Sequence, residues 1–245
     1  MRLSSRRQSR DFMTSDGEKR FGALLRTGRW FGGVDPQFAV RLLAEGVARS
    51  FARGQWLFSR GDPSDGLYAM TSGAVRVRAS TPSGKETLLA LLEPPMWFGE
   101  IGVFDRQPRT HDAIAEDEVT VLHVPQAALE AALAASPHYW RDLGQLAVSK
   151  LRQAFVAMEA MAVQPLAVRL AGTLVVLAER YGELHDRSSK TIELGQEQLA
   201  AMLSSSRQTV NALLRDLESR GLVRVSYGTI EILDKDGLKA IANPT

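Results

Sequence analysis

Hydrophobic residues change their spacing twice along this chain of 245 residues. Between residues 21 and 50 they recur at helical spacing, at Phe38, Leu42, Leu43 and Val47. From residue 50 to residue 125 they come in short alternating runs, and beyond residue 125 the helical spacing returns. The pattern predicts helices, then a block of strands, then helices again.

The central block is predicted to consist of strands. Turn signals at residues 60–66, 72–73 and 82–84 divide it into short segments. These segments lie at residues 56–58, 66–70, 74–78, 87–92 and 119–124. Short strands at this spacing predict a small antiparallel barrel or sandwich.

A long helix is predicted after a short one at residues 126–135. Ser136 has the side chain of a helix N-cap, and Pro137 suits the first helical position. The helix extends to about Ala162, and Gln164-Pro165 ends it and forms a hinge.

One face of this long helix repeats in heptads. Its positions alternate steps of four and three: Trp140, Gly144, Ala147, Leu151, Ala154, Met158 and Met161. This pattern fits a helix packed on its own barrel or a seam between two copies of the chain. We favour the dimer seam because the strict repeat lasts three heptads and its small residues allow close approach.

The C-terminal part has the pattern of a winged helix-turn-helix. A helix at residues 165–181, closed by Gly182, precedes a polar loop (183–190) and a strand at 191–194. Two short helices joined by serines follow, and a hairpin at residues 222–233 comes after Gly221. Six apolar residues of the two helices have the spacing to pack together: Leu199, Leu203, Val210, Leu213, Leu214 and Leu217. The second helix can then enter a DNA major groove.

The outward face of that second helix carries groups that suit DNA. Arg207 suits guanine and Gln208 suits adenine, and Asn211 and Arg215 lie on the same face. Residues expected to add backbone or phosphate contacts are Gln196, Ser204, Ser206 and Thr209. Two structural interpretations compete: Gln208 forms a capping box with Ser205, or Arg215 pairs with a neighbouring acid.

Composition excludes several classes of protein. An apolar fraction of 44% and a charged fraction of 24% are typical of soluble globular proteins. No apolar run has the length of a membrane span and no secretory signal is present, so we expect a cytoplasmic protein. Residues 1–20 are basic and polar and are expected to form a disordered tail. A net charge of +2 is too small to indicate nucleic-acid binding by itself.

The chain lacks the side chains, or their spacing, that metal and redox sites need. The chain has no cysteine, which excludes disulfides, thiolate zinc sites and cysteine-held iron–sulfur clusters. The histidines His111, His123, His138 and His185 lack metal-ligand spacing. We therefore expect no metal site, no redox cofactor and no enzyme of the cupin type.

The segment 97–110 carries the most specific chemistry. It places Glu100 nine residues before Arg109, behind Gly99. A cyclic nucleotide needs a carboxylate for its ribose hydroxyl, and a guanidinium with free backbone N–H donors for its phosphate. Gly99 and Gly102 would let the backbone approach the phosphate, and a short helical turn would aim its N–H groups at the anion. The alternative is a structural ion pair between Glu100 and Arg109.

These motifs resemble the cAMP receptor protein/FNR family of bacterial transcription regulators. The resemblance extends from Phe21 to the C-terminus. It is carried by the barrel glycines Gly54, Gly61 and Gly73, by Phe98-Gly-Glu and Pro108-Arg-Thr, and by Ser206-Arg-Gln-Thr-Val. It implies that Gly99, Glu100, Ile101, Arg109 and Thr110 hold the sugar-phosphate, and that Phe155 lies at the purine.

The resemblance implies an α+β architecture in four parts. Residues 1–20 form the tail, 21–135 an antiparallel jelly-roll barrel of the cyclic-nucleotide-binding type, 136–164 a dimerisation helix and hinge, and 165–245 a winged helix-turn-helix. The implied partners are double-stranded DNA with a two-fold symmetric operator and a second copy of the chain. The polar loop 183–190 is a possible contact for RNA polymerase.

The chain departs from the family pattern at the expected nucleotide site and at the expected DNA-reading helix. Ala154 and Phe155 align with a Thr-Ser pair that faces adenine in the member best known for cAMP, and His111 replaces a small residue. The usual Arg-Glu-Thr-Val-x-Arg is here Arg207-Gln-Thr-Val-Asn-Ala212, so the half-site is expected to depart from the family's TGTGA.

The leading hypothesis is a homodimeric DNA-binding regulator gated by cAMP or cGMP. One alternative is a regulator of the same family whose nucleotide site is degenerate and senses another ligand or none. A second is a cyclic-nucleotide module that acts through a protein partner without DNA. Effector, target genes, and activator or repressor role do not follow from the sequence.

Overall fold

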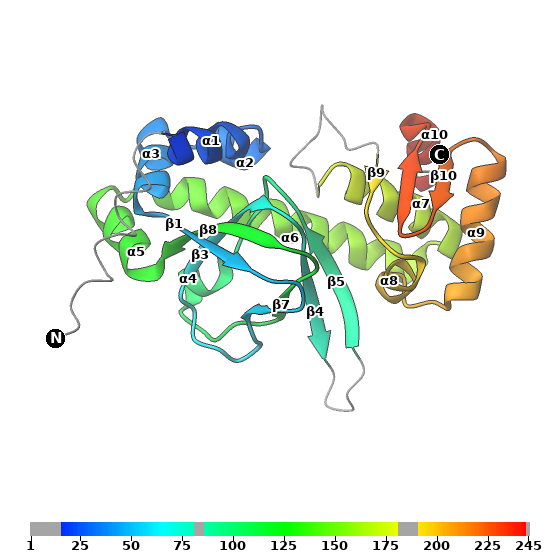
Figure 1. Ribbon diagram of the computed structural model, residues 1–245, viewed down its shortest axis with the longest axis horizontal. Helices are drawn as coiled ribbons and strands as arrows, with labels where there is room; N and C mark the ends of the chain where they lie inside the picture. Colours follow the sequence, from blue (N-terminus) through cyan, green and yellow to red (C-terminus); the bar gives the residue numbers. More distant parts are fainter. Residues whose placement is uncertain (1–15, 81–85, 181–190, 244–245) are drawn as a thin grey trace.

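The computed structural model describes residues 16–80, 86–180 and 191–243. Helices and two sheets form an N-terminal unit, the long helix α6 (Tyr139–Val163) follows, and a smaller C-terminal unit completes the chain. Figure 1 shows the two units side by side along α6. Among the described residues, no helix is both long and apolar enough to cross a membrane.

Three short helices open the described chain. They are α1 (Asp16–Leu25), α2 (Arg29–Gly33) and α3 (Pro36–Glu45). The first begins inside the stretch predicted as a tail, of which residues 1–15 lie outside the described residues. Asp35 caps α3 by accepting hydrogen bonds from the amides of Gln37 and Phe38. The helical spacing was misleading at Val47, which starts the first strand because Gly46 leaves the helical conformation.

The strands form two antiparallel sheets of four rather than the closed barrel that was one of the expected forms. Their orders are β1-β8-β3-β6 and β2-β7-β4-β5. The strands are β1 (Val47–Phe51), β2 (Trp56–Phe58), β3 (Gly66–Ser72), β4 (Val75–Ser80), β5 (Glu86–Leu92), β6 (Trp97–Phe98), β7 (Asp112–Ala115) and β8 (Val119–Pro125). The architecture is a jelly-roll-like sandwich.

Two apolar layers hold the N-terminal unit together. Tyr68, Met70 and Phe98 belong to the layer between the two sheets. The other face of the first sheet, which includes Leu67, packs with Trp97 against the helices. Alternate residues of β3 thus enter different cores, and this explains why almost the whole strand is buried.

The start of α6 differs from the prediction. Ser136 is the C-cap of α5 (Gln126–Ala135), and its amide bonds to the carbonyl of Ala132. Residues 136–138 form a turn, so the helix begins at Tyr139 without a side-chain cap. The preceding helix therefore uses the serine that the sequence assigned to the following one.

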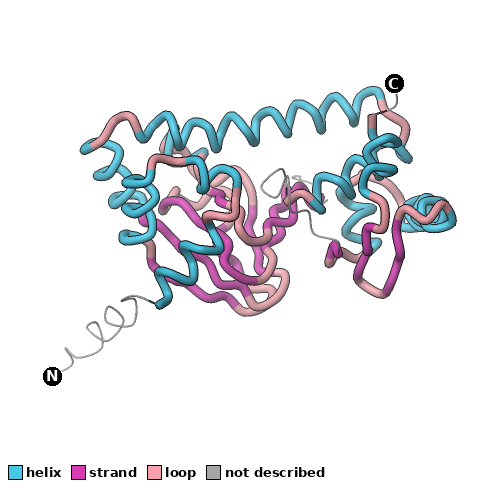
Figure 2. The backbone as a smooth tube through the Cα atoms, turned by 90° about the horizontal axis from the view of Figure 1, so that it is seen from above, coloured by secondary structure: helices cyan, strands magenta, loops and turns pink. Residues whose placement is uncertain are grey.

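The long helix uses different faces for packing and exposure. Tyr139, Leu143 and Leu146 are buried against the N-terminal unit. Beyond Leu146, α6 runs past the sheets toward the C-terminal unit, as the view from above shows (Figure 2). Its apolar residues there are largely exposed, including Leu151, Met158 and Met161.

The C-terminal unit contains two helices joined by a turn and a three-stranded sheet of order β10-β11-β9. Its elements are α7 (Leu166–Ala178), β9 (Thr191–Ile192), α8 (Gln196–Met202), α9 (Arg207–Ser219), β10 (Val223–Ser226), β11 (Thr229–Ile232) and α10 (Lys235–Ala242). The first of these helices ends earlier than predicted, because Arg180 adopts a left-handed φ of 49°. Gly182 and the loop 183–190 lie outside the described residues.

The apolar core of this unit matches the prediction. Leu199, Leu203, Val210, Leu214 and Leu217 are buried, and Leu213 is partly buried against them. The wing strands are fixed to α9 by a hydrogen bond from the amide of Val225 to Glu218. The structure is therefore a winged helix-turn-helix, with β9 as a third strand beside the wing.

Candidate functional site

The segment 97–110 forms a tight cassette around Arg109. Gly99 has a left-handed φ of 96°. A Cβ there would lie 2.8 Å from Nη1 of Arg109 and 2.9 Å from the carbonyl oxygen of Gly66. Only glycine fits this position, because both the backbone angle and the space exclude a side chain.

A short helix follows in the cassette, as the sequence predicts. It is α4 (Ile101–Asp105), and Glu100 stands at its N-cap. Ile101 is exposed on this helix. Gly102 lets α4 pack against the β2–β3 loop, since a Cβ there would collide with the Ser64 side chain. Its approach to a phosphate stays a prediction.

The guanidinium of Arg109 is buried and held in place. Nη1 donates to the carbonyl oxygen of Gly99 at 3.1 Å, and Nη2 donates to that of Gly66 at 2.9 Å. The group also lies over the Phe58 ring, 4.3 Å from its centroid. Its Nε–H is buried and has no acceptor among the described residues. Such a donor is rare in folded proteins and an anion would satisfy it.

A carboxylate pairs with Arg109, and it comes from outside the cassette. Nη2 of Arg109 lies 2.6 Å from Oδ1 of Asp65, and the Tyr68 hydroxyl donates to Oδ2 at 2.7 Å. Nε2 of His123 lies 3.3 Å from the same oxygen. Burial alone would raise the pKa of Asp65, but hydrogen bonds with His123, Tyr68 and Arg109 hold it well below its usual value. Burial and the bond to Asp65 raise the pKa of Tyr68.

Glu100 takes its own partner from the long helix. Its Oε2 lies 2.7 Å from Nζ of Lys150, and the carboxylate is almost fully buried. The alternative prediction of a structural ion pair between Glu100 and Arg109 was therefore wrong, because each group has a different counterion. Asp65 and Lys150 are two residues of the site that the sequence pattern does not single out. Asp65 lies in a stretch taken only as a turn, and Lys150 directly precedes the seam residue Leu151.

The remaining predicted residues of this site are exposed or half-buried. The hydroxyl of Thr110 lies 2.9 Å from Nδ1 of His111. Partial burial and the nearby Arg60 lower the pKa of His111. On α6, Ala154 is exposed and the Phe155 side chain is 61% exposed. Lys150 and Phe155 thus lie on one helix, the first engaged with the cassette and the second open.

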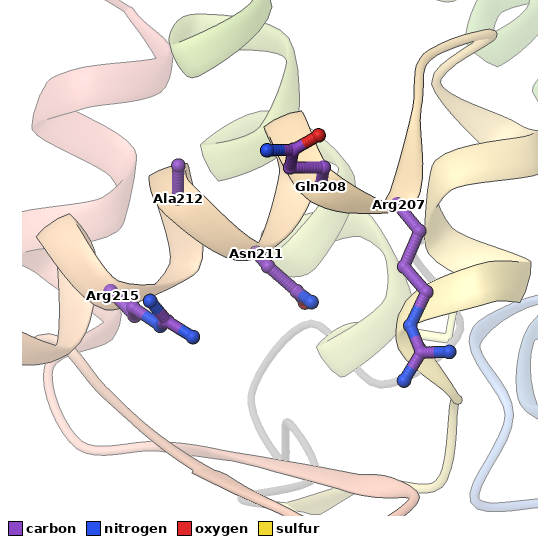
Figure 3. A pocket seen from close by; sticks show the side chains of 5 residues that line it. All are labelled: Arg207, Gln208, Asn211, Ala212 and Arg215. Atoms are coloured by element: carbon purple, nitrogen blue, oxygen red, sulfur yellow. The ribbon is translucent and has the colours of Figure 1, made fainter.

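The second candidate site is the outer surface of α9. The five residues Arg207, Gln208, Asn211, Ala212 and Arg215 line an open hollow of about 590 Å³. In Figure 3 the side chains of Arg207, Asn211 and Arg215 project from one side of the helix, and Gln208 and Ala212 lie along the adjacent row. Buried Val210, Leu214 and Leu217 occupy the opposite face. The helix therefore presents two cations and two amides outward.

The hydrogen bonds at the N-terminus of α9 show which side chains cap the helix. Ser206 is the N-cap, and its hydroxyl accepts from the amide of Thr209 at 3.1 Å and lies 2.7 Å from the Thr209 hydroxyl. The predicted capping box of Ser205 with Gln208 is wrong, so Gln208 is not needed to cap the helix. Arg215 has no acidic partner within the described part of the chain, which removes the other structural interpretation.

The turn before α9 exposes further polar groups. Ser204 is exposed and adopts a left-handed φ of 51° one residue beyond Leu203, the C-cap of α8. Gln196 is half-buried at the first position of α8. Gln196 thus begins α8 and Ser204 lies in the turn between α8 and α9, and their contacts with the DNA backbone remain a prediction.

The heptad positions of α6 are available for contact. Trp140, Leu151, Ala154, Met158 and Met161 are exposed, and Gly144 and Ala147 are half-buried. The interpretation in which this seam packs on its own sheets was wrong, because Tyr139, Leu143 and Leu146 make that contact.

Two family models match successive parts of the chain. Residues 48–136 match the cyclic nucleotide-binding domain, and residues 168–241 match the Crp-like helix-turn-helix domain. The first match contains Asp65, Glu100 and Arg109, and the second contains all of α9.

Similar proteins align with this chain over most of their length. The chain is 32% identical over 209 residues to the CRP-like cAMP-activated global transcriptional regulator of Mycobacterium tuberculosis, covering 85% of this chain and 93% of that protein. It is 28% identical to the cyclic AMP receptor protein of Thermus thermophilus, with 86% and 95% covered.

Solved structures agree with the fold. A CRP/FNR-family transcriptional regulator from Thermus thermophilus is 29% identical with a TM-score of 0.62, covering 80% of this chain and 97% of the other. FixK2 from Bradyrhizobium japonicum has a TM-score of 0.71 at 19% identity, with 82% and 98% covered, and shows the fold alone.

Proposed function

Because the chain belongs to the CRP/FNR family of transcription regulators, we propose that it is a homodimer whose affinity for DNA is set by cAMP or cGMP. In this proposal it is a binding protein rather than an enzyme. The observation that carries the proposal is the cradle of Arg109. A buried guanidinium with an unsatisfied N–H packs directly on the backbone of Gly99, which only a residue without a side chain allows. This is the chemistry that a cyclic phosphate requires.

The roles within the site follow from the contacts. Arg109 and the backbone at Gly99 would bind the phosphate, with Thr110 as a further hydroxyl. Glu100 would accept from the ribose hydroxyl, and Lys150 would hold its carboxylate in place. Phe155 offers an aromatic face to the purine. Residues 154 and 155 cannot repeat the Thr-Ser contact to adenine, so cAMP and cGMP are both candidates.

Nucleotide binding is tested by removing the guanidinium. Charge-assisted hydrogen bonds contribute about 1.5–3 kcal/mol, so Arg109→Ala should weaken cAMP or cGMP binding about 10- to 150-fold in calorimetry. Arg109→Lys keeps the charge but not the planar donors and should also lose affinity. Arg106→Ala is the matched control, since that side chain is exposed and pairs loosely with Glu130. Equal affinity of wild type and Arg109→Ala would refute the assignment.

A second candidate is a regulator that binds no cyclic nucleotide. The observation in its favour is that Arg109 is only 6% exposed and already pairs with Asp65. A phosphate must then share or displace that carboxylate. Calorimetry of the wild-type protein distinguishes the two, because absence of heat with both nucleotides at millimolar concentration favours this candidate. DNA binding is unaffected by that outcome.

The DNA interface is proposed on the outward face of α9. Arg207 and Gln208 would contact base edges, Asn211 and Arg215 would contact bases or phosphates, and Ser204, Ser206, Thr209 and Gln196 would contact the backbone. A homodimer places two such helices on a two-fold symmetric operator. RNA polymerase is a further partner that we propose only for promoters where the dimer activates.

Specificity at one base pair is the sharpest test of this interface. Genomic fragments selected by gel shift define the operator. Gln208→Ala should then cost about 1–3 kcal/mol, or about 5- to 150-fold, and relax the preference at a single base pair of each half-site. Arg220→Gln at the far end of α9 is the control and should keep that preference. A selected operator that both variants read identically would remove Gln208 from base recognition.

A further inference from the structure

The β4–β5 hairpin has two apolar faces that serve different units of the molecule. Its strands pair with a register shift between Val77 and Arg78, which face Ala90 and Leu88. Leu89 is therefore the extra residue of a β-bulge. A shift of one residue exchanges the faces of a strand. Leu88 and Leu91 consequently share one face, although they are three residues apart.

The two faces enter different cores. Leu92 and Ala90 pack with Val75 and Val77 between the sheets of the N-terminal unit. Leu88 and Leu91 instead belong to the apolar core of the C-terminal unit, together with Leu170, Leu174 and Leu199. Leu91 is 2% exposed, so this contact excludes water.

Polar contacts border the same patch. The Thr87 hydroxyl donates to the carbonyl oxygen of Ala201 at 3.3 Å, which joins β5 to α8. Just past the end of β5, Glu93 forms an ion pair with Arg180, just past the end of α7. Both side chains are at most 17% exposed. Removing one partner of such a pair leaves a poorly solvated charge, so the pair fixes how the two units sit.

This patch is connected to the cassette through the sheet. Thr110 lies two residues before β7, and β7 pairs with β4 from Asp112 to Ala115. β4 in turn pairs with β5 over most of its length. A change in position at Arg109 and Thr110 can therefore reach α8 through three hydrogen-bonded strands, without passing along α6.

We propose that an interdomain seat joins the two units and consists of Thr87, Leu88, Leu91, Glu93 and Arg180. Glu93 and Arg180 are its positioning residues. They set the placement of the helix-turn-helix domain and hence its affinity for DNA. The seat is a second connection between the units besides α6. Its control of DNA affinity rests on the DNA-binding part of the proposed function, and its response to ligand rests on the nucleotide part.

Loosened variants test the seat without changing either binding site. Glu93→Gln and Arg180→Gln remove the charges at nearly constant volume, and Leu88→Ala trims the apolar face. Leu89→Ala is the matched control, since that bulged leucine is 43% exposed and belongs to neither core. Circular dichroism and thermal melts establish that each variant is folded. Operator affinity is then measured without nucleotide and with saturating cAMP or cGMP.

A locked variant tests the opposite change. The chain has no cysteine, so Thr87→Cys with Ala201→Cys introduces a single possible disulfide across the seat. Oxidation should form it rapidly in the full-length protein, and each single-cysteine variant is a control. Failure of the disulfide to form under mild oxidation would overturn the seat itself.

The loosened and locked proteins should change operator affinity in opposite directions, each by at least about fivefold. The locked protein should also lose its response to nucleotide, and reduction of the disulfide should restore it. Operator affinity within twofold of wild type in all folded variants would overturn the proposal. If wild type itself ignores both nucleotides, nucleotide gating fails, and the nucleotide-free affinities still decide whether the seat positions the domain.

Discussion

At the scale of single residues, the charges of the cassette are arranged as two separate pairs. Arg109 pairs with Asp65, and Glu100 pairs with Lys150. Each pair joins the segment 97–110 to a different element, the β2–β3 loop in one case and α6 in the other. A ligand that binds Arg109 and Glu100 therefore perturbs the contacts of the cassette with both the β2–β3 loop and α6. Through these two ion pairs, ligand binding can change the positions of both elements.

The Asp65 carboxylate predicts an acid-dependent loss of stability. Its pKa is lowered in the folded protein, so its contribution is fully present above its ordinary pKa of about 3.8 and is lost as pH falls below that value. The Asp65→Asn variant has no carboxylate at this position and therefore lacks this pH-dependent contribution to stability. Melting temperature should therefore fall less between pH 6 and pH 3 in Asp65→Asn than in wild type.

The control for this prediction is Asp62→Asn, three residues earlier in the same loop. The Asp62 carboxylate accepts a hydrogen bond from the nearby amide of Ser59, and among the described residues it has none of the buried partners that surround Asp65. It should keep the wild-type pH dependence. An identical acid-induced decrease in wild type and Asp65→Asn would show that the carboxylate is not held in its charged form by its neighbours.

The residue types of the site were predictable, but their partners were not. Gly99 and Arg109 are marked by local sequence, since a left-handed glycine and a guanidinium lie in one short segment. Asp65 reaches Arg109 across 44 residues of sequence, and Lys150 reaches Glu100 across 50. Nothing in the local spacing specifies such a contact, because it depends on how the strands and α6 are placed.

At the scale of elements, the run Thr87-Leu-Leu-Ala-Leu-Leu92 shows what a hydrophobic pattern can and cannot predict. A run of apolar residues predicts a strand buried on both faces, and that is correct for β5. The pattern does not predict that the second face belongs to another unit. The bulge at Leu89 decides this, and bulges leave no reliable signal in apolar sequence.

The exposed face of α6 predicts a dimer that a single charge disrupts. Leu151 is 53% exposed and lies at the centre of the heptad seam, so Leu151→Glu should leave the folded monomer intact. In a parallel pair it would bring two carboxylates together in an apolar seam. Sedimentation should show conversion from dimer to monomer at micromolar concentration, and operator affinity should fall at least about tenfold because the two half-sites are no longer bound together.

Gln145→Glu is the matched control for the seam. It adds the same charge at an exposed position of α6 outside the heptad series and should remain dimeric. Dimers of equal stability in both variants would place the interface on another surface of the protein.

At the scale of the whole molecule, two connections link the nucleotide site to the DNA-binding surface. The helix α6 carries Lys150 at the cassette and leads through Pro165 to α7. The β4–β5 hairpin joins the same units through buried side chains. Two connections restrict the units more than one would, and they favour a small number of discrete arrangements. That is what a switch between two DNA affinities requires.

Thermodynamic linkage gives a prediction that involves both sites at once. If cAMP or cGMP raises operator affinity by some factor, the operator must raise affinity for that nucleotide by the same factor. Nucleotide titrations would be run on the dimer with and without saturating operator, at one salt concentration because DNA binding depends strongly on salt. Arg207→Ala is the control, since it should bind nucleotide normally and should need more operator than wild type to show the same effect of added DNA. Unequal factors at a protein concentration that keeps the dimer intact would mean that a third equilibrium, such as a change in oligomeric state, separates the two sites.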